Sequence, residues 1–183
     1  MKKVLLSALL SLVAISGFAQ AEHLSFLGVK MGSPLKEFYQ NILAKGFAND
    51  YPPRALGKNY AAAQVRGVFA GQEATQIMIC ANGILVDMVI VTFPAYETWN
   101  EAKAVYLTLW DGFTKKYKIE KQTEKGDLDT VGDKCSSVLD VVDGRILLEL
   151  EEKDNKYVVS ITYADKPGNG RSTDRDSSVM GDI

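Results

Sequence analysis

Histidine and cysteine are scarce in this 183-residue sequence, which holds one His and two Cys. A catalytic triad or a histidine metal site would therefore depend on His23, close to the N-terminus, where chain mobility opposes the positioning that a general base needs. We expect His23 to be a solvated or strand-edge residue. Cys-x-x-Cys pairs, phosphate-binding glycine loops and Gly-x-Ser-x-Gly are also missing. The sequence thus predicts no metal, no cofactor and no recognisable catalytic residues.

The two cysteines, Cys80 and Cys135, allow two interpretations. In an oxidising compartment, a disulfide between them would close a loop of about 55 residues and stabilise the fold by roughly 4 kcal/mol. Alternatively, both are buried thiols, because Cys80 lies within an apolar strand pattern. Spacing alone leaves both interpretations open.

Neither sign of charge is in large excess: 21 Lys and Arg face 23 Asp and Glu, which gives a net charge of −2. No basic block with interleaved aromatic residues is present, so we expect no nucleic-acid partner. Beyond the N-terminus there is no long apolar run, and we expect no membrane span in the mature chain.

The N-terminus has the three parts of a secretory signal peptide. Lys2 and Lys3 are followed by an apolar run from Val4 to Ile15 and by Ala19-Gln20-Ala21. We predict a signal peptide over 1–21, with cleavage after Ala19 or an uncleaved anchor as alternatives. No cysteine follows the run, so the product should be periplasmic or extracellular and not lipid-anchored.

The first half of the mature chain reads as one helix and three strands. Ser33 as N-cap, Pro34 at the first helical position and an apolar stripe predict a helix that ends at Gly46. Residues 48–59 contain Pro52-Pro53 and are expected to form a loop. Strands are predicted over 61–70, 75–81 and 84–93, with a hairpin at Asn82-Gly83.

The second half repeats this order. Thr98 and Glu101 form a capping box before a helix with a Trp- and Tyr-rich stripe. Residues 118–134 are polar and are expected to be a loop. Strands follow over 135–142, 145–151 and 157–163, and a polar, flexible tail is expected over 167–183.

Together these elements predict an α+β fold with a single domain over 22–166. Two tandem α-β-β-β units, about 33–94 and 97–164, would form one mainly antiparallel sheet with both helices packed on one face. In the first unit, alternation leaves a second apolar face that points away from the helices, where antiparallel sheets usually carry polar residues. The side chains expected there, besides Cys80, are Met78, Val86, Met88 and Ile90.

An exposed apolar patch of this kind is typical of interaction sites. We therefore predict an exported, soluble binding module whose protein partner, or second copy, docks on the face opposite the helices. The alternative is that the tail, the N-terminal arm or a symmetric dimer covers these residues permanently.

Two other functions stay open. A carboxylate-dependent hydrolase acting on cell-wall or glycan material would need two carboxyl groups about 5–9 Å apart in a cleft; Asp87 is the notable candidate, although no spacing nominates a pair. A carrier of small apolar ligands would need an enclosed cavity lined by Phe93, Trp110 and Phe113.

Several short motifs resemble an uncharacterised family of small exported bacterial proteins. They are His23-Leu24-Ser25-Phe26-Leu27-Gly28-Val29, Lys45-Gly46-Phe47, Val68-Phe69-Ala70-Gly71, Phe93-Pro94 with Thr98-Trp99, and Lys116-Tyr117. The resemblance implies no activity and no site residues. The tandem plan is also similar to the architecture of β-lactamase-inhibitor proteins, from which it departs by having one helix in each half.

Overall fold

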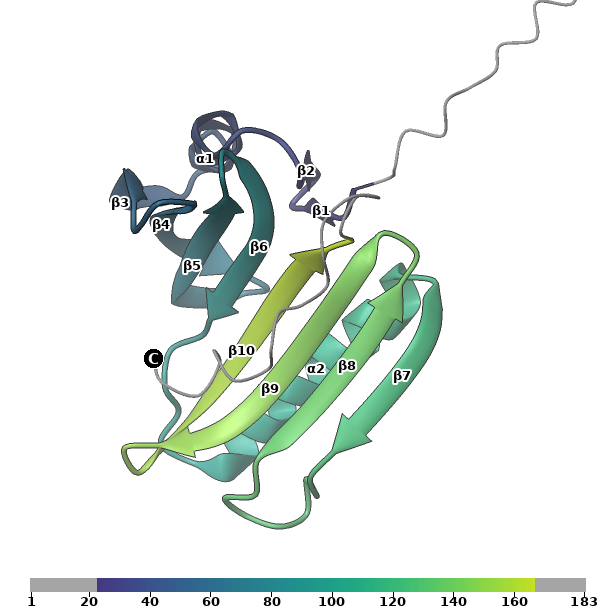
Figure 1. The fold of residues 1–183 in the computed structure, drawn as a ribbon. Coiled ribbons are helices and arrows are strands. Elements are labelled where there is room, and N and C mark those ends of the chain that lie inside the picture. Colours follow the sequence, from purple (N-terminus) through teal and green to yellow (C-terminus); the bar gives the residue numbers. More distant parts are fainter. Residues whose placement is uncertain (1–22, 167–183) are drawn as a thin grey trace, which may run out of the picture.

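The computed structural model describes residues 23–166, and all structural statements below refer to this part of the chain. It is an α+β structure of two helices, a large antiparallel sheet and a small two-stranded sheet (Figure 1). In chain order the elements are β1 Ser25–Phe26, β2 Val29–Lys30, α1 Leu35–Leu43, β3 Ala48–Ala55, β4 Tyr60–Phe69, β5 Gln72–Asn82, β6 Leu85–Thr92, α2 Trp99–Lys116, β7 Ile119–Lys125, β8 Cys135–Val141, β9 Gly144–Lys153 and β10 Lys156–Asp165.

The large sheet has eight strands in the order β3-β4-β5-β6-β10-β9-β8-β7, and every neighbouring pair is antiparallel. Each helix is followed by four strands, and the last strands of the two sets, β6 and β10, meet at the centre. The predicted α+β class is confirmed. That the two halves arose by duplication stays a prediction.

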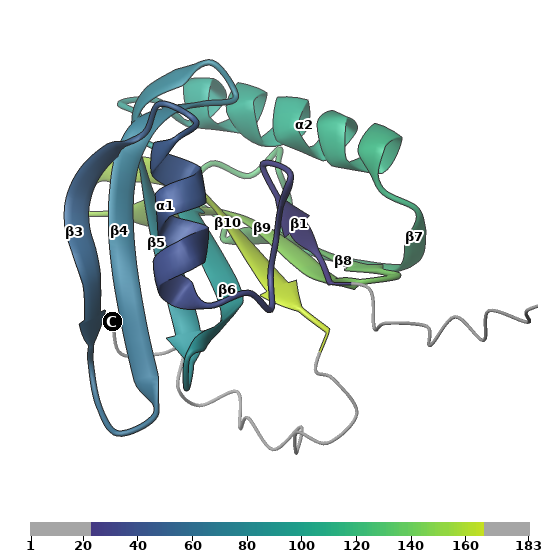
Figure 2. The ribbon, with the colours of Figure 1, turned by 90° about the horizontal axis from the view of Figure 1, so that it is seen from above.

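One face of this sheet carries the core, and both helices pack on it (Figure 2). A single cross-strand row shows this, since its members pair in register from β4 to β8 and each is at most 3% exposed. The row comprises Val65, Ile77, Val91, Ile161, Leu148 and Ser137. Residues in one row point to the same side of a pleated sheet, so α1 and α2 cover the same face, as predicted.

Two strands form where the sequence predicted loops. β3 lies in the expected loop 48–59 and β7 in the expected loop 118–134, and they are the two edges of the sheet. Both are largely exposed on both faces, so neither shows the alternation of apolar and polar residues by which half-buried strands are recognised. The predicted count of three strands in each half was therefore wrong by one.

The predicted N-cap of α2 is confirmed, and the predicted N-cap of α1 is wrong. α2 begins with the predicted capping box, in which the Thr98 side chain accepts from the Glu101 backbone N–H and the Glu101 carboxylate accepts from Thr98. For α1 the N-cap residue is Pro34, and no side chain caps the helix. Ser33 instead donates to the Lys30 carbonyl at 3.0 Å, because β2 and its following turn lie within reach of the hydroxyl.

The N-terminal arm folds into a hairpin that closes the core between the two halves. β1 and β2 are joined by a turn at Leu27 and Gly28, both with positive φ. Phe26, only 1% exposed, stacks on Phe69 at 5.6 Å between ring centroids and meets Tyr163 edge-on at 5.1 Å. This segment, predicted as a short strand or arm, is thus an integral part of the core.

The helices of the described residues are too short or too polar to cross a bilayer. The expected signal peptide over 1–21 and the expected tail over 167–183 lie outside the described residues.

Candidate functional site

The face of the eight-stranded sheet opposite the helices, called here the outer face, carries a continuous row of uncharged side chains. Its members pair in register across all eight strands. This outer row comprises Tyr51, Gln64, Met78, Ile90, Thr162, Leu147, Val138 and Thr123. No described helix packs over it, and Met78 at its middle is 39% exposed.

A second row, one step along the strands, widens the apolar area at the centre of the sheet. There Ala62, Cys80, Met88 and Ala164 pair in sequence across β4, β5, β6 and β10. We call the five larger apolar side chains of the two rows the outer patch; it consists of Met78, Met88, Ile90, Val138 and Leu147. Apart from Met78 these are partly buried among their neighbours on the sheet.

Three of the four predicted binding residues, Met78, Met88 and Ile90, therefore lie together on the outer face. The placement of Val86 was wrong, because its side chain is fully buried with the core. A register shift explains the error: Met88 pairs with Cys80, but Val86 pairs with Ala81, so that Asp87 is an extra, half-buried residue in β6. Such a bulge reverses the alternation beyond it.

The size of the outer patch limits what can dock on it. From β5 to β8 there are four strand spacings, about 19 Å in all, and the two rows are separated by about 7 Å. A stable interface between two globular proteins needs about 800 Å² on each partner. The outer patch is much smaller, and its length and width match a single helix of three to four turns or a short extended segment.

Charged residues border the outer patch, and most of them are already paired with each other. Arg145 donates to Asp140 at 2.6 Å, and Lys134 reaches Glu149 at 3.3 Å and Glu151 at 3.0 Å. The hydrogen bond to Glu151 is the main reason why the pKa of Lys134 is raised. The border thus offers little uncompensated charge, and an apolar occupant is favoured over a strongly charged one.

Neither edge of the sheet is suited to accept another strand. β3 holds Pro52 and Pro53 and two register irregularities, and β7 is largely composed of Lys and Glu. Prolines, bulges and charged side chains are the usual means by which edge strands avoid pairing with other chains. Docking by strand addition is therefore disfavoured, and the outer face is the more accessible surface.

Of the two interpretations left open for the cysteines, the disulfide is wrong, because Cys80 and Cys135 are not bridged. Cys80 and Cys135 lie on β5 and β8, strands that are four strand spacings or about 19 Å apart, and their side chains point to opposite faces of the sheet. A disulfide requires Cα atoms within about 7 Å. Cys135 is buried, and this burial raises the pKa of its thiol, which favours the less reactive protonated form. The thiol interpretation of Cys135 is the correct one.

His23 is held in place, contrary to the expectation of a mobile N-terminal residue. Its Nδ1 lies 2.5 Å from Oδ2 of Asp165 at the end of β10, and the backbone N–H of Leu24 donates to Oδ1 of the same carboxylate at 2.8 Å. The Asp165 side chain is only 6% exposed. This contact could not be predicted from the sequence, because the two residues are 142 positions apart. It attaches the N-terminal hairpin to the end of β10.

Removing this carboxylate should destabilise the protein. We expect Asp165→Ala to lower the free energy of unfolding by about 1–3 kcal/mol, because the Leu24 N–H loses its acceptor. Asp165→Asn, which keeps an acceptor oxygen, should lose less. Urea unfolding of the three proteins measures both effects; equal stability of wild type and Asp165→Ala would contradict the fastening role.

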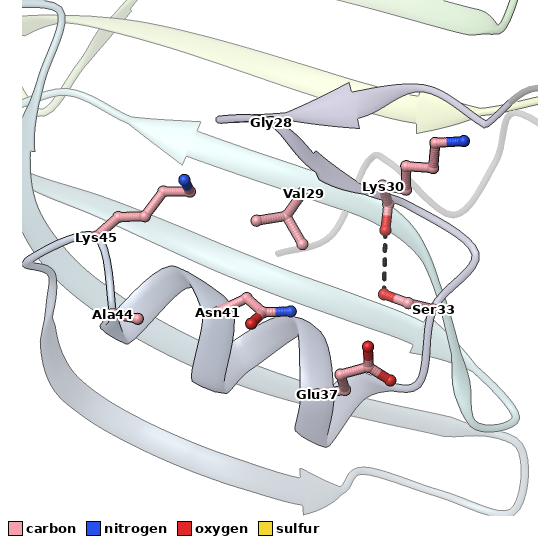
Figure 3. Close-up of a pocket in the computed structure, with 8 residues that line it drawn as sticks. All are labelled: Gly28, Val29, Lys30, Ser33, Glu37, Asn41, Ala44 and Lys45. Atoms are coloured by element: carbon pink, nitrogen blue, oxygen red, sulfur yellow. Dashed lines mark hydrogen bonds between the residues drawn. The ribbon is translucent and has the colours of Figure 1, made fainter.

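A shallow pocket of about 460 Å³ lies between the β1–β2 hairpin and α1 (Figure 3). It is lined by Gly28, Val29, Lys30, Ser33, Glu37, Asn41, Ala44 and Lys45. Glu37 is the one carboxylate in this lining, so the pocket does not supply the pair of carboxyl groups that a glycoside hydrolase uses. The side chains of Lys30, Glu37, Asn41 and Lys45 in this lining are exposed.

The three aromatic side chains proposed to line a ligand cavity belong to the core or pack against it. Phe93 lies 6.0 Å from Phe69 and Phe113 lies 6.1 Å from Tyr163, between ring centroids, and Trp110 is partly buried against the core. Within residues 23–166, no group of three or more His, Cys, Asp or Glu side chains could hold a metal ion.

Comparisons with protein-family models, with curated proteins and with solved structures give no match to this chain.

Proposed function

We propose that this protein is an exported binding module that holds a short apolar segment of a partner protein on its outer patch. The observation that carries this proposal is the uncharged outer row, which crosses the whole sheet on the face that no helix of residues 23–166 covers. Export is supported by the signal-peptide pattern over residues 1–21. Methionine suits such a surface, because its flexible, polarizable side chain adapts to varied apolar partners.

The dimensions and the charges favour one class of partner. The patch fits one amphipathic helix or extended segment, and its charged border is largely neutralised by internal ion pairs. The blunted edges β3 and β7 direct binding to the face rather than to a strand end. An apolar segment with polar flanks would thus bury its apolar side chains on Met78, Met88 and Ile90.

Site-specific cross-linking in the native cells tests this function. A photo-reactive phenylalanine analogue replaces Met78 in one protein and Leu107 in a control; Leu107 is 43% exposed on α2, so the two sites have similar accessibility. We expect one defined cross-linked protein from position 78 and none from position 107. The cross-link should fall at least tenfold when Met88→Asp is added, provided that thermal unfolding shows an intact fold.

The proposal would be wrong if position 78 gave no cross-linked protein, or if positions 78 and 107 gave the same set. Thr123→Asp, in the outer row but outside the outer patch, controls for added charge and should reduce the cross-link less than Met88→Asp. Should Met88→Asp fail to fold, Met78→Asp with the cross-linker at position 147 replaces it, because the Met78 side chain is already partly in water.

A further inference from the structure

The chain leaves the sheet beside the outer patch. β10 is a central strand, and it ends at Asp165 between β6 and β9. Ala164 pairs with Met88, and Lys166 donates its backbone N–H to the Asp143 carbonyl at 3.0 Å. The described chain therefore ends close to Met88, on a central strand and not on an edge strand of the sheet.

The sequence of 167–183 divides into two parts. Residues 167–178 hold Gly, Ser, Asp, Arg and other polar types with Pro167, and no apolar side chain of the Val, Leu, Ile, Met or aromatic kind. The last five residues, Val179-Met180-Gly181-Asp182-Ile183, contain three such side chains. This is the pattern of a polar tether that carries a short apolar segment.

The tether is long enough to place that segment on the outer patch. The 13 steps from Lys166 to Val179 span up to about 44 Å. Met88 lies on β6, the strand next to β10. Met78 lies on β5, which is two strand spacings or about 10 Å from β10. A tether of this length gives an effective concentration in the millimolar range, so that even a weak contact would be populated.

We propose that residues 179–183 dock on the outer patch of their own chain and compete there with the partner segment. This inference rests on the proposed function, since it assigns the regulation of the same surface. Residues 179–183 match the partner segment proposed for the outer patch, because they carry a few apolar side chains on a short segment. A partner must displace it, so the segment lowers the apparent affinity and restricts binding to partners with a stronger apolar motif.

Methionine methyl NMR on the exported chain tests the proposal, because the chain beyond residue 21 holds four methionines, Met31, Met78, Met88 and Met180. Met31 is 1% exposed in the core and is the internal reference. In Val179→Asp/Ile183→Asp, we expect the Met78 and Met88 signals to shift and the Met31 signal to stay. Ser172→Asp/Thr173→Asp adds the same charge within the tether and should leave all three unchanged.

The shifts should not depend on protein concentration. Unchanged Met78 and Met88 signals in Val179→Asp/Ile183→Asp would overturn the proposal, and shifts that vary with concentration would assign the patch to a second copy instead. The two proposals fail separately. If the signals stay but position 78 still cross-links a partner, only this inference is lost. If they shift while no partner is cross-linked, the docking of residues 179–183 stands, and the partner function and the competition with it are lost.

Discussion

Phe26→Ala should lower the free energy of unfolding by about 3–5 kcal/mol, the range for removing a large, fully buried aromatic side chain. Phe26 is 1% exposed and contacts Phe69 from the first half of the sheet and Tyr163 from the second. Its loss would leave a cavity where the two halves meet, which a two-residue strand cannot collapse to fill. Chemical denaturation followed by fluorescence or circular dichroism measures the effect.

Two Leu→Ala substitutions, one at a buried and one at an exposed position, test whether the N-terminal hairpin is part of the core. Leu24, 1% exposed in the same segment, should lose about 2–4 kcal/mol on Leu24→Ala, whereas Leu56, 59% exposed, should lose little on Leu56→Ala. If Phe26→Ala and Leu24→Ala were both as mild as Leu56→Ala, the hairpin would not be part of the core.

Gly144→Ala should destabilise the protein by a different mechanism, because the added methyl group has no space. A Cβ at Gly144 would lie 2.3 Å from the Ala164 carbonyl oxygen and 3.3 Å from a methyl carbon of Leu24. The carbonyl belongs to the paired backbone of β10, so it cannot move without disturbing the β9–β10 ladder. We expect a loss of about 1–3 kcal/mol, measured by thermal or urea unfolding.

Gly112→Ala makes the same chemical change and should instead stabilise the protein. Gly112 lies within α2, and a Cβ there would meet nothing within 4 Å. Alanine is favoured over glycine in a helix by about 0.5–1 kcal/mol, so this variant should be more stable than the wild type. A destabilised Gly112→Ala together with a neutral Gly144→Ala would contradict the packing described for both elements.

Regular patterns in the sequence were sufficient to predict the helices and the inner strands. The capping box at Thr98 and Glu101 and the apolar stripes gave the two helices, and alternation gave the strands and the shared helix-covered face. β3 and β7 could not be predicted, because edge strands exposed on both sides need no apolar alternation. They form through backbone pairing with neighbours whose positions only the tertiary structure fixes.

Alternation along the strands also predicted part of the candidate site. The outer-face positions of Met78, Met88 and Ile90 follow from alternation along β5 and β6. Val86 lies beyond a β-bulge, and the residues around it contain no signal from which this bulge could be predicted. Leu147 and Val138, from the second half, alternate with buried residues in β9 and β8, and this signal was available in the sequence. That they line up with Met78 depends on the pairing of β6 with β10, a contact between residues about 70 apart in the chain.

A cross-linking scan over the surface tests the central claim, that the helix-free face of the sheet is the binding surface. The photo-reactive residue is placed in turn at Met78 and Leu147 on the outer patch, at Leu107 on α2 and at Val131, which is 65% exposed in the β7–β8 loop. The account predicts that positions 78 and 147 give the same cross-linked protein and that positions 107 and 131 give none. A defined partner cross-linked from position 107 or 131, with none from the outer patch, would contradict it.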